Sequence, residues 1–315
     1  MRTITRRDGP AIGLAGKKER RLLKHWDLYV MLAPALLFLL IFKYTPMYGV
    51  IIAFQDFNVI KGMLNSPWVG LKHFEELFMF AEFPRVVRNT LIISLMKLVF
   101  GFPAPILLAL LLNELLLVRF KRVVQTITYV PHFISWVVVG GIFIDILSPS
   151  SGIVNKLIEA FGFDPIFFMS DEKLFRWILV FTDTWKEAGW GAIIYLAALL
   201  GINEELFQAA KVDGASRLRQ IWHISLPCIR STIVILLLLR IGHIFDAGFE
   251  QVLVMYNATV YDVADIIDTY VFRVGLGQMQ FGLTTAAGLF KSLIGCILLI
   301  VANWFARRMG EEGIY

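Results

Sequence analysis

Ionisable and aromatic side chains gather inside stretches of sequence that are otherwise apolar. The densest group lies between Asp183 and Tyr195, where carboxylates and a lysine alternate with tryptophans. Ionisable groups within apolar spans usually face a bundle interior or a water-filled cavity. Aromatic faces can stack on the C–H faces of sugar rings while charged groups hydrogen-bond the hydroxyls. The group therefore suggests a pathway for a polyhydroxylated solute, although ion pairs and aromatic packing inside a helical bundle would explain it equally well.

Basic residues in other apolar stretches extend this group. Since such cations seldom lie in hydrocarbon without a partner, they belong to the same hypothesis. Their positive charge would suit an acidic saccharide. The candidate pathway residues are Lys97, Asp183, Trp185, Lys186, Glu187, Trp190, Tyr195, Arg240 and Lys291.

No catalytic pattern accompanies these residues. The sequence contains neither HExxH nor GxSxG, and the string closest to a GxxxxGK[ST] phosphate loop has Phe290 where the second glycine belongs. Cys228 and Cys296 stand apart from each other and from any histidine cluster, which argues against a disulfide framework or a metal site. We expect a protein that is not an enzyme and that holds no metal and no cofactor of its own.

The composition indicates lipid as the surrounding solvent. Hydrophobic residues make up 57% of the 315 residues and charged residues only 17%, with a mean hydropathy of +0.69. Soluble domains carry about 25% charged residues. The net charge of +5 does not indicate nucleic-acid binding, because the basic residues lie between or before apolar runs and no basic groove with interleaved aromatics is evident.

Six apolar segments are long enough to cross a bilayer as helices, which takes about 20 residues each. The first is too long for the apolar core of a signal peptide, so we expect a retained helix. Basic residues on the side of the N-terminus outnumber those opposite by roughly two to one, which places both termini in the cytoplasm. We therefore expect an all-α integral membrane protein. The expected spans are 28–52, 88–112, 123–147, 174–200, 230–249 and 283–306.

The segment 202–229 is too long for a simple connection between spans. Asn203 can cap a helix with acidic residues in its first turn, and that helix should run to about Val212. Gly214 should end it, because glycine accepts the left-handed conformation that helix ends often need. A second short helix, about 215–224, should follow, and Pro227 suits the first turn of the next span. The result is a protruding hairpin of helices, which could dock another protein or lie flat on lipid.

This segment resembles the EAA loop of permeases in binding-protein-dependent ABC importers. The family pattern is Glu-Ala-Ala, then Gly, then Ile-x-Leu-Pro, and Gln208 here replaces the glutamate, which removes one possible ion pair with an ATPase. The resemblance implies a type I importer permease fold with a coupling helix. The implied ATPase-coupling residues are Gln208, Ala209, Ala210, Asp213, Gly214, Ala215, Ile224, Leu226 and Pro227.

Further strings resemble the oligosaccharide and polysaccharide branch of these permeases, of the LplB-like type. They are Phe42-Lys-Tyr-Thr-Pro-Met-Tyr-Gly49, Ser66-Pro-Trp-Val-Gly-Leu71, Arg88-Asn-Thr-Leu91 and Asn303-Trp-Phe305. The resemblance implies a multi-pass protein of the cytoplasmic membrane that imports a sugar. A non-sugar solute is the alternative cargo, whereas a membrane enzyme or a sensor lacks the residues or the domain it would need.

The resemblance also implies the partners. An ABC ATPase dimer would bind ATP and Mg, a second permease would complete a heterodimer, and an extracytoplasmic solute-binding lipoprotein would deliver the sugar. Otherwise the chain contacts membrane lipid. Within the chain we expect a basic cytoplasmic tail at 1–24, the permease domain at 25–306 and a C-terminal tail at 307–315.

Overall fold

The computed structural model describes residues 26–308, and the regular secondary structure in that range is helical apart from a single bridge between Gln55 and Trp68. The chain divides into two compact units after Ile51. The expected tail 1–24 and most of 307–315 lie outside the described residues. In the first unit the helical elements are α2 (Trp26–Leu39), η1 (Leu40–Tyr44), α3 (Thr45–Met47) and the start of η2 (Tyr48–Phe54).

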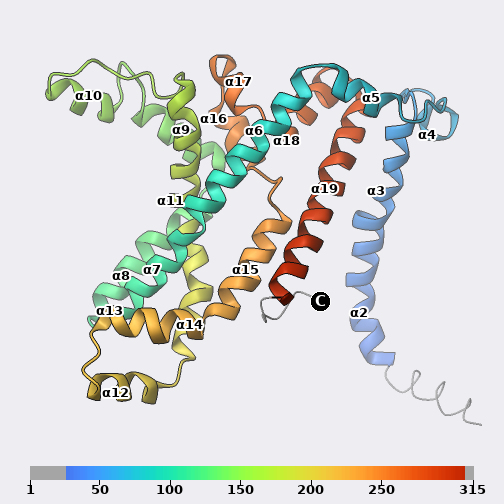
Figure 1. Cartoon of the computed structure of the whole chain (residues 1–315). Helices are drawn as coiled ribbons and strands as arrows, with labels where there is room; N and C mark the ends of the chain where they lie inside the picture. The colour runs from blue at the N-terminus through green and yellow to red at the C-terminus, as the bar shows by residue number, and fades with distance from the viewer. Residues whose placement is uncertain (1–25, 309–315) are drawn as a thin grey trace, which may run out of the picture. The chain divides into compact units, whose positions relative to one another are not determined.

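The second unit holds the remaining helices (Figure 1). Its first half contains α4 (Gly62–Asn65), α5 (Lys72–Met79), α6 (Glu82–Met96), η3 (Lys97–Gly101), α7 (Pro103–Glu114), α8 (Val118–Tyr129), η4 (Val130–Phe133), α9 (Trp136–Ile146) and α10 (Ile153–Ala160). Its second half contains α11 (Glu172–Leu200), α12 (Glu204–Val212), α13 (Arg217–Gln220), η5 (Ile221–Ser225), α14 (Leu226–Cys228), α15 (Arg230–Gly242), α16 (Phe249–Met255), η6 (Ala258–Val260), α17 (Tyr261–Ala264), α18 (Ile267–Tyr270), η7 (Val271–Gly277) and α19 (Phe281–Arg308).

Apolar spans account for most of this length. Three continuous helical segments of the described chain are long and apolar enough to cross a membrane, namely Trp26–Phe54, Glu82–Glu114 and Phe281–Arg308. Three pairs of helices with a sharp bend between them bring the number to as many as six. The prediction of an all-α protein is therefore confirmed, and the six expected spans equal the upper number of candidate spans in the described chain.

Two expected spans are not single helices. The segment 123–147 consists of α8 and α9, which meet at 105° just before Ser135, whose side chain caps α9. The helix in the segment 230–249 also ends early, because α15 stops at Gly242. The next helix, α16, begins only after Gly248, which has a φ of +94°. Polar and charged residues at 243 and 246 replace the apolar pattern in this gap. Periodic hydrophobicity alone did not reveal either break.

Prolines are accommodated in the long helices by π-helical turns. A proline lacks the backbone N–H and its ring would clash with the carbonyl four residues earlier, so a wider turn before it relieves the conflict. Three such turns each end two residues before a proline: η1 before Pro46, η3 before Pro103 and η5 before Pro227.

Helix α11 forms the centre of the second unit and packs against α7, α8, η3 and η4. Two of its glycines allow close approach. A Cβ at Gly189 would lie 1.9 Å from the Thr128 carbonyl oxygen, and one at Gly191 would lie 3.0 Å from Pro105. These contacts hold α7 and α8 against α11 and so fix the walls of the cavity described below.

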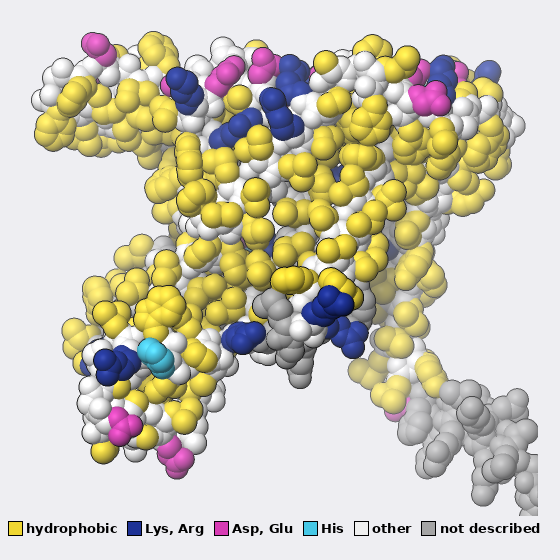
Figure 2. Space-filling model, viewed as in Figure 1, with side chains coloured by type: hydrophobic (Ala, Val, Ile, Leu, Met, Phe, Trp, Pro, Cys, Tyr) yellow, Lys and Arg dark blue, Asp and Glu magenta, His cyan; other side chains and the backbone are white. Residues whose placement is uncertain are grey.

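The surface of the second unit carries a broad apolar zone. Figure 2 shows hydrophobic side chains over the middle of this unit, with acidic and basic side chains gathered towards its two ends. Large apolar residues such as Leu111 and Leu293 are 67% and 63% exposed. A soluble protein would expose such a zone only at a cost, whereas in a bilayer it faces the hydrocarbon.

Candidate functional site

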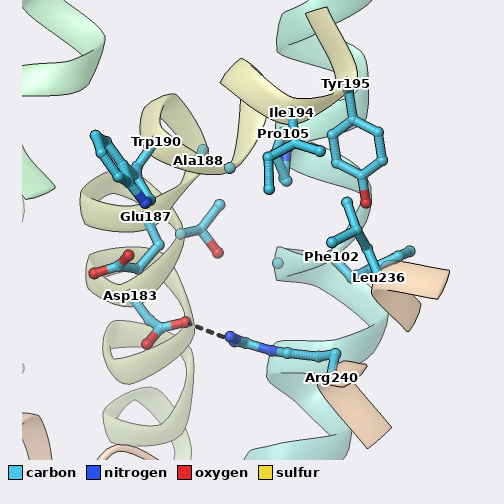
Figure 3. A pocket seen from close by; sticks show the side chains of 13 residues that line it. Phe102, Pro105, Asp183, Glu187, Ala188, Trp190, Ile194, Tyr195, Leu236 and Arg240 are labelled. Carbon is cyan, nitrogen blue, oxygen red and sulfur yellow. Dashed lines mark hydrogen bonds and ion pairs between the residues drawn. The ribbon is translucent and has the colours of Figure 1, made fainter. Parts of the chain in front are cut away.

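A cavity of about 190 Å³ lies between α7, α11 and α15. Figure 3 shows its walls, with Asp183 and Arg240 meeting from opposite sides. The cavity brings together some of the predicted pathway residues, and apolar side chains such as Phe102 and Leu236 complete the lining. The predicted residues on its wall are Asp183, Glu187, Trp190, Tyr195 and Arg240.

Lys97 lies behind this cavity and is almost completely buried. Its ammonium group donates to Asp183 at 3.0 Å, to the Ala247 carbonyl at 2.9 Å and to Gln251 at 2.5 Å. An ammonium has three N–H donors, so these contacts satisfy it. The structure thus places Lys97 in an internal ion pair, which ties the non-helical segment before α16 to η3 and α11.

Lys186 is buried at the bend between α8 and α9. It donates to the carbonyls of His132 at 2.5 Å and Pro131 at 3.4 Å, and its nitrogen lies 5.5 Å from the centre of the Trp136 ring. The His132 ring in turn hydrogen-bonds Glu187 at 2.8 Å. These contacts fasten the bend to α11 and satisfy carbonyls that the break in the helix leaves free.

Trp185 and Lys291 lie away from this cavity. Trp185 packs edge-on against Phe143, 5.5 Å between ring centres, and lines a different cavity. Lys291 on α19 pairs with Asp246 at 2.5 Å and Asp268 at 2.8 Å. Of the nine predicted pathway residues, five therefore share one cavity, and four lie behind it or elsewhere.

Helix α12 has a well-defined beginning and end. The Asn203 side chain accepts from the Glu205 N–H at 3.0 Å, as the sequence predicts. At the other end Gly214 has φ +74°, Ala215 donates to the Ala210 carbonyl at 2.8 Å and Gly214 donates to the Lys211 carbonyl at 3.1 Å. This pair of bonds is a Schellman motif, which needs a left-handed residue at the position of Gly214.

The same helix makes little contact with the rest of the unit. None of its residues is buried, and Leu206 and Val212 are 48% and 89% exposed. Of the predicted coupling residues, Gln208, Ala209, Asp213, Gly214 and Pro227 are exposed, whereas Ala210, Ala215, Ile224 and Leu226 are half-buried.

The chain after α12 differs from the prediction. The second helix starts at Arg217, after Ser216 as its cap, and α13, η5 and α14 carry it to Cys228, beyond the expected end at 224. Pro227 lies in α14, ahead of a 62° bend into α15, and not in the first turn of that span. The π-helical turn before Pro227 lets the helix continue where the sequence pattern indicates a stop.

Comparison with known proteins places this geometry in context. The family model described as "Binding-protein-dependent transport system inner membrane component" matches residues 101–311, a stretch that contains the cavity and α12. The chain belongs to this family. It is thus an inner-membrane transport component, and the family is not one of enzymes, which agrees with the predicted lack of catalysis.

Several relatives of this permease are closely similar. The polygalacturonan/rhamnogalacturonan transport system permease protein YteP of Bacillus subtilis is 48% identical over 305 residues, covering 95% of both chains. Protein LplB of the same organism is 48% identical over 288 residues, covering 91% of both. The predicted LplB-like resemblance is therefore confirmed.

A solved structure has the same fold. A crystal structure of a bacterial alginate ABC transporter, in complex with a periplasmic protein bound to an alginate pentasaccharide, contains a chain 41% identical to this permease. The TM-score is 0.87, and the match covers 94% of this permease and 99% of that chain. The predicted type I permease fold is confirmed.

Sequence reasoning missed three residues that shape the site. Gln251 is fully buried and also donates to the Leu179 carbonyl at 2.8 Å, and His132 stacks on Trp190 with ring centres 4.6 Å apart. A Cβ at Gly248 would lie 2.6 Å from the Lys97 nitrogen. The available signal was a glycine and an amide, Gly248 and Gln251, just after the charged residues of a short span, because interrupted helices mark binding sites in transporters.

Proposed function

We propose that this permease is the membrane-spanning subunit of an ABC importer for saccharides, with an acidic oligosaccharide or polysaccharide fragment as its cargo. YteP is a permease of a polygalacturonan/rhamnogalacturonan transport system, and the solved structure is of an alginate ABC transporter. A cavity with aromatic, carboxylate and guanidinium groups between three helices fits such a cargo.

Helix α12 carries the coupling part of this proposal. It is a short, capped helix with no buried side chain, so its order comes from its own caps and its surface is free for a partner. We infer that an ATPase subunit grips it, that the α12 end faces the cytoplasm, and that both termini lie on that side. The ATPase dimer binds ATP and Mg, and the permease itself needs no cofactor.

The remaining partners follow from the same arrangement. A second permease completes the pathway as a heterodimer. A solute-binding lipoprotein delivers the sugar at the end of the second unit that carries α17, opposite the end that carries α12 (Figure 1). ATP-driven closure of the ATPases moves α12 as a rigid body. Binding that differs between nucleotide states then shifts the bundle between two packings, one open to each side.

The coupling role is tested with the permease, its partner permease and the ATPase reconstituted in vesicles. ATP hydrolysis is measured with receptors loaded with oligogalacturonate, alginate oligosaccharides or a neutral oligosaccharide. We expect one loaded receptor to stimulate hydrolysis and Gly214→Pro to abolish the response, because proline cannot adopt the φ of +74°. A permease that never assembles with an ATPase, or works normally as Gly214→Pro, would contradict the proposal.

Two tryptophans of α11 test the pathway as a matched pair. Trp190 lies on the cavity wall, whereas Trp185 lines a different cavity beside Phe143, and their exposed fractions are similar at 45% and 41%. We expect Trp190→Ala to lower sugar uptake by about tenfold and Trp185→Ala to lower it by less than about twofold. Equal losses from both substitutions would mean that the cavity is not the pathway.

A further inference from the structure

Arg240 is the cation on the cavity wall with unused hydrogen-bonding capacity. A guanidinium carries five N–H donors. Among the described residues its hydrogen-bond partner is Asp183, at 3.4 Å, and its side chain is 47% exposed. By contrast, Lys97 beside it makes three contacts of 3.0 Å or less and is buried. The guanidinium therefore reaches into the cavity with most of its donors free for a ligand.

The charges around the cavity leave Arg240 in excess. Each carboxylate on the wall already has a lysine behind it, since Asp183 pairs with Lys97 and Glu187 lies 3.6 Å from Lys186. On the other side of Arg240, Asp246 lines a second cavity, and Lys291 pairs with both Asp246 at 2.5 Å and Asp268 at 2.8 Å. On the wall of the first cavity, Arg240 shares its carboxylate partner Asp183 with Lys97, so a carboxylate from outside the chain would give Arg240 a partner of its own.

An arginine within a membrane bundle is costly unless an anion or water satisfies it. Its planar fork matches a carboxylate with two parallel hydrogen bonds, a geometry that a lysine ammonium cannot supply. Trp190 is 45% exposed and lines the same cavity, so an aromatic side chain and an acid-binding fork are available together (Figure 3). A uronic acid residue presents a sugar ring and a carboxylate in this combination.

We propose that Arg240 binds the carboxylate of a uronic acid residue as an acidic saccharide passes through the cavity, exchanging its long contact with Asp183 for the substrate. Asp183 then remains paired with Lys97, so the exchange leaves no buried charge alone. This inference rests on the proposed function and deepens it, because it assigns the acidic group of the cargo to one side chain.

A purely structural role makes a different prediction. If the contact between Arg240 and Asp183 only tied α15 to α11, losing Arg240 would disturb the cavity for every saccharide, acidic or neutral. If Arg240 binds the carboxylate of the substrate, Arg240→Gln should weaken binding of an acidic saccharide and leave binding of its neutral ester unchanged.

The experiment measures calorimetric binding of trigalacturonate, and of its neutral methyl ester, to the purified complex of permeases and ATPase without the receptor. We expect Arg240→Gln to lower the affinity for trigalacturonate by about tenfold or more, and Arg240→Lys to lower it less. Affinity for the ester should be weak and change by less than about twofold.

Three outcomes would overturn the inference: unchanged affinity for trigalacturonate in Arg240→Gln, equal proportional losses of affinity for trigalacturonate and its ester in that variant, or no binding of trigalacturonate by the native complex. Receptor-stimulated ATP hydrolysis reports the proposed function separately. If a loaded receptor stimulates the native complex while any of these outcomes holds, the importer function stands and only the role of Arg240 fails.

Discussion

The two ends of the second unit are built in opposite ways. At the α17 end, Arg273 donates to Glu82 at 2.9 Å and to Asp265 at 2.6 Å, and Asp265 is only 1% exposed. At the α12 end, the helix has no buried side chain and depends on hydrogen bonds within its own segment. One end is held together by contacts between distant parts of the chain, and the other by local bonds.

This difference separates stability from function. Glu82 and Arg273 are far apart in sequence, so their ion pair fixes α6 against η7 and helps to set the shape of the bundle. Helix α12 can be altered without disturbing the core, because none of its residues is buried among the described part of the chain. Substitutions at the α17 end should therefore lower folding stability more than ATP hydrolysis. Substitutions at the α12 end should lower receptor-stimulated ATP hydrolysis more than folding stability.

The largest effect is expected for Arg273→Met. It leaves the buried carboxylate of Asp265 without its cation, which costs about 3 kcal/mol of stability at neutral pH. Thermal denaturation of the purified permease complex measures this loss. The double variant Arg273→Met with Asp265→Asn removes the stranded charge, so it should regain most of the stability, and failure to regain it would mean that the ion pair is not the cause.

The same variant should respond to pH. Burial raises the pKa of Asp265 above its ordinary value, and the loss of Arg273, whose charge lowers that pKa, should raise it further. For a carboxyl with a raised folded-state pKa, the stabilising contribution is present at low pH and lost as the pH rises through that pKa. The loss of stability caused by Arg273→Met, relative to the native chain, should therefore be smaller at about pH 5 than at about pH 8. A loss of stability that does not change with pH would exclude this explanation.

A smaller effect on stability, but a clear one on coupling, is expected for Gly214→Val. A β-branched residue at φ +74° costs roughly 1–2 kcal/mol locally, although no atom lies within 4 Å of the added Cβ. Receptor-stimulated ATP hydrolysis should fall several-fold while the denaturation temperature hardly moves. Gly214→Asn is the control, since asparagine tolerates this conformation, and equal losses in both variants would argue against the Schellman motif as the cause.

The smallest effect is expected for Asn203→Ala. It removes one side-chain cap, worth about 1 kcal/mol, and frays only the first turn of α12. Stimulated hydrolysis should fall by less than about twofold, and Asn203→Asp should restore it because aspartate caps equally well. If Asn203→Ala lowered hydrolysis as much as Gly214→Val, the first turn of α12 would be part of the docking surface.

The sequence by itself determined the features that depend on neighbouring residues. Apolar length predicted the spans because a bilayer sets the length of a helix. Asn203 and Gly214 predicted both ends of α12, since a cap and a left-handed residue act within a few positions of the chain. The string from Gln208 to Pro227 predicted the family, which the comparisons confirm.

Only the tertiary structure decided which side chains meet. Lys97 and Asp183 are 86 positions apart, and nothing local in the sequence pairs them. Trp185 and Trp190 lie on one helix, and a separation of five positions puts their side chains about 140° apart around the helix axis. The sequence therefore implies that they point different ways, but the packing of α7 and α15 against α11 decides that Trp190 faces the cavity. Helical periodicity fixes the angle between two side chains on one helix, whereas long-range packing fixes what each side chain faces.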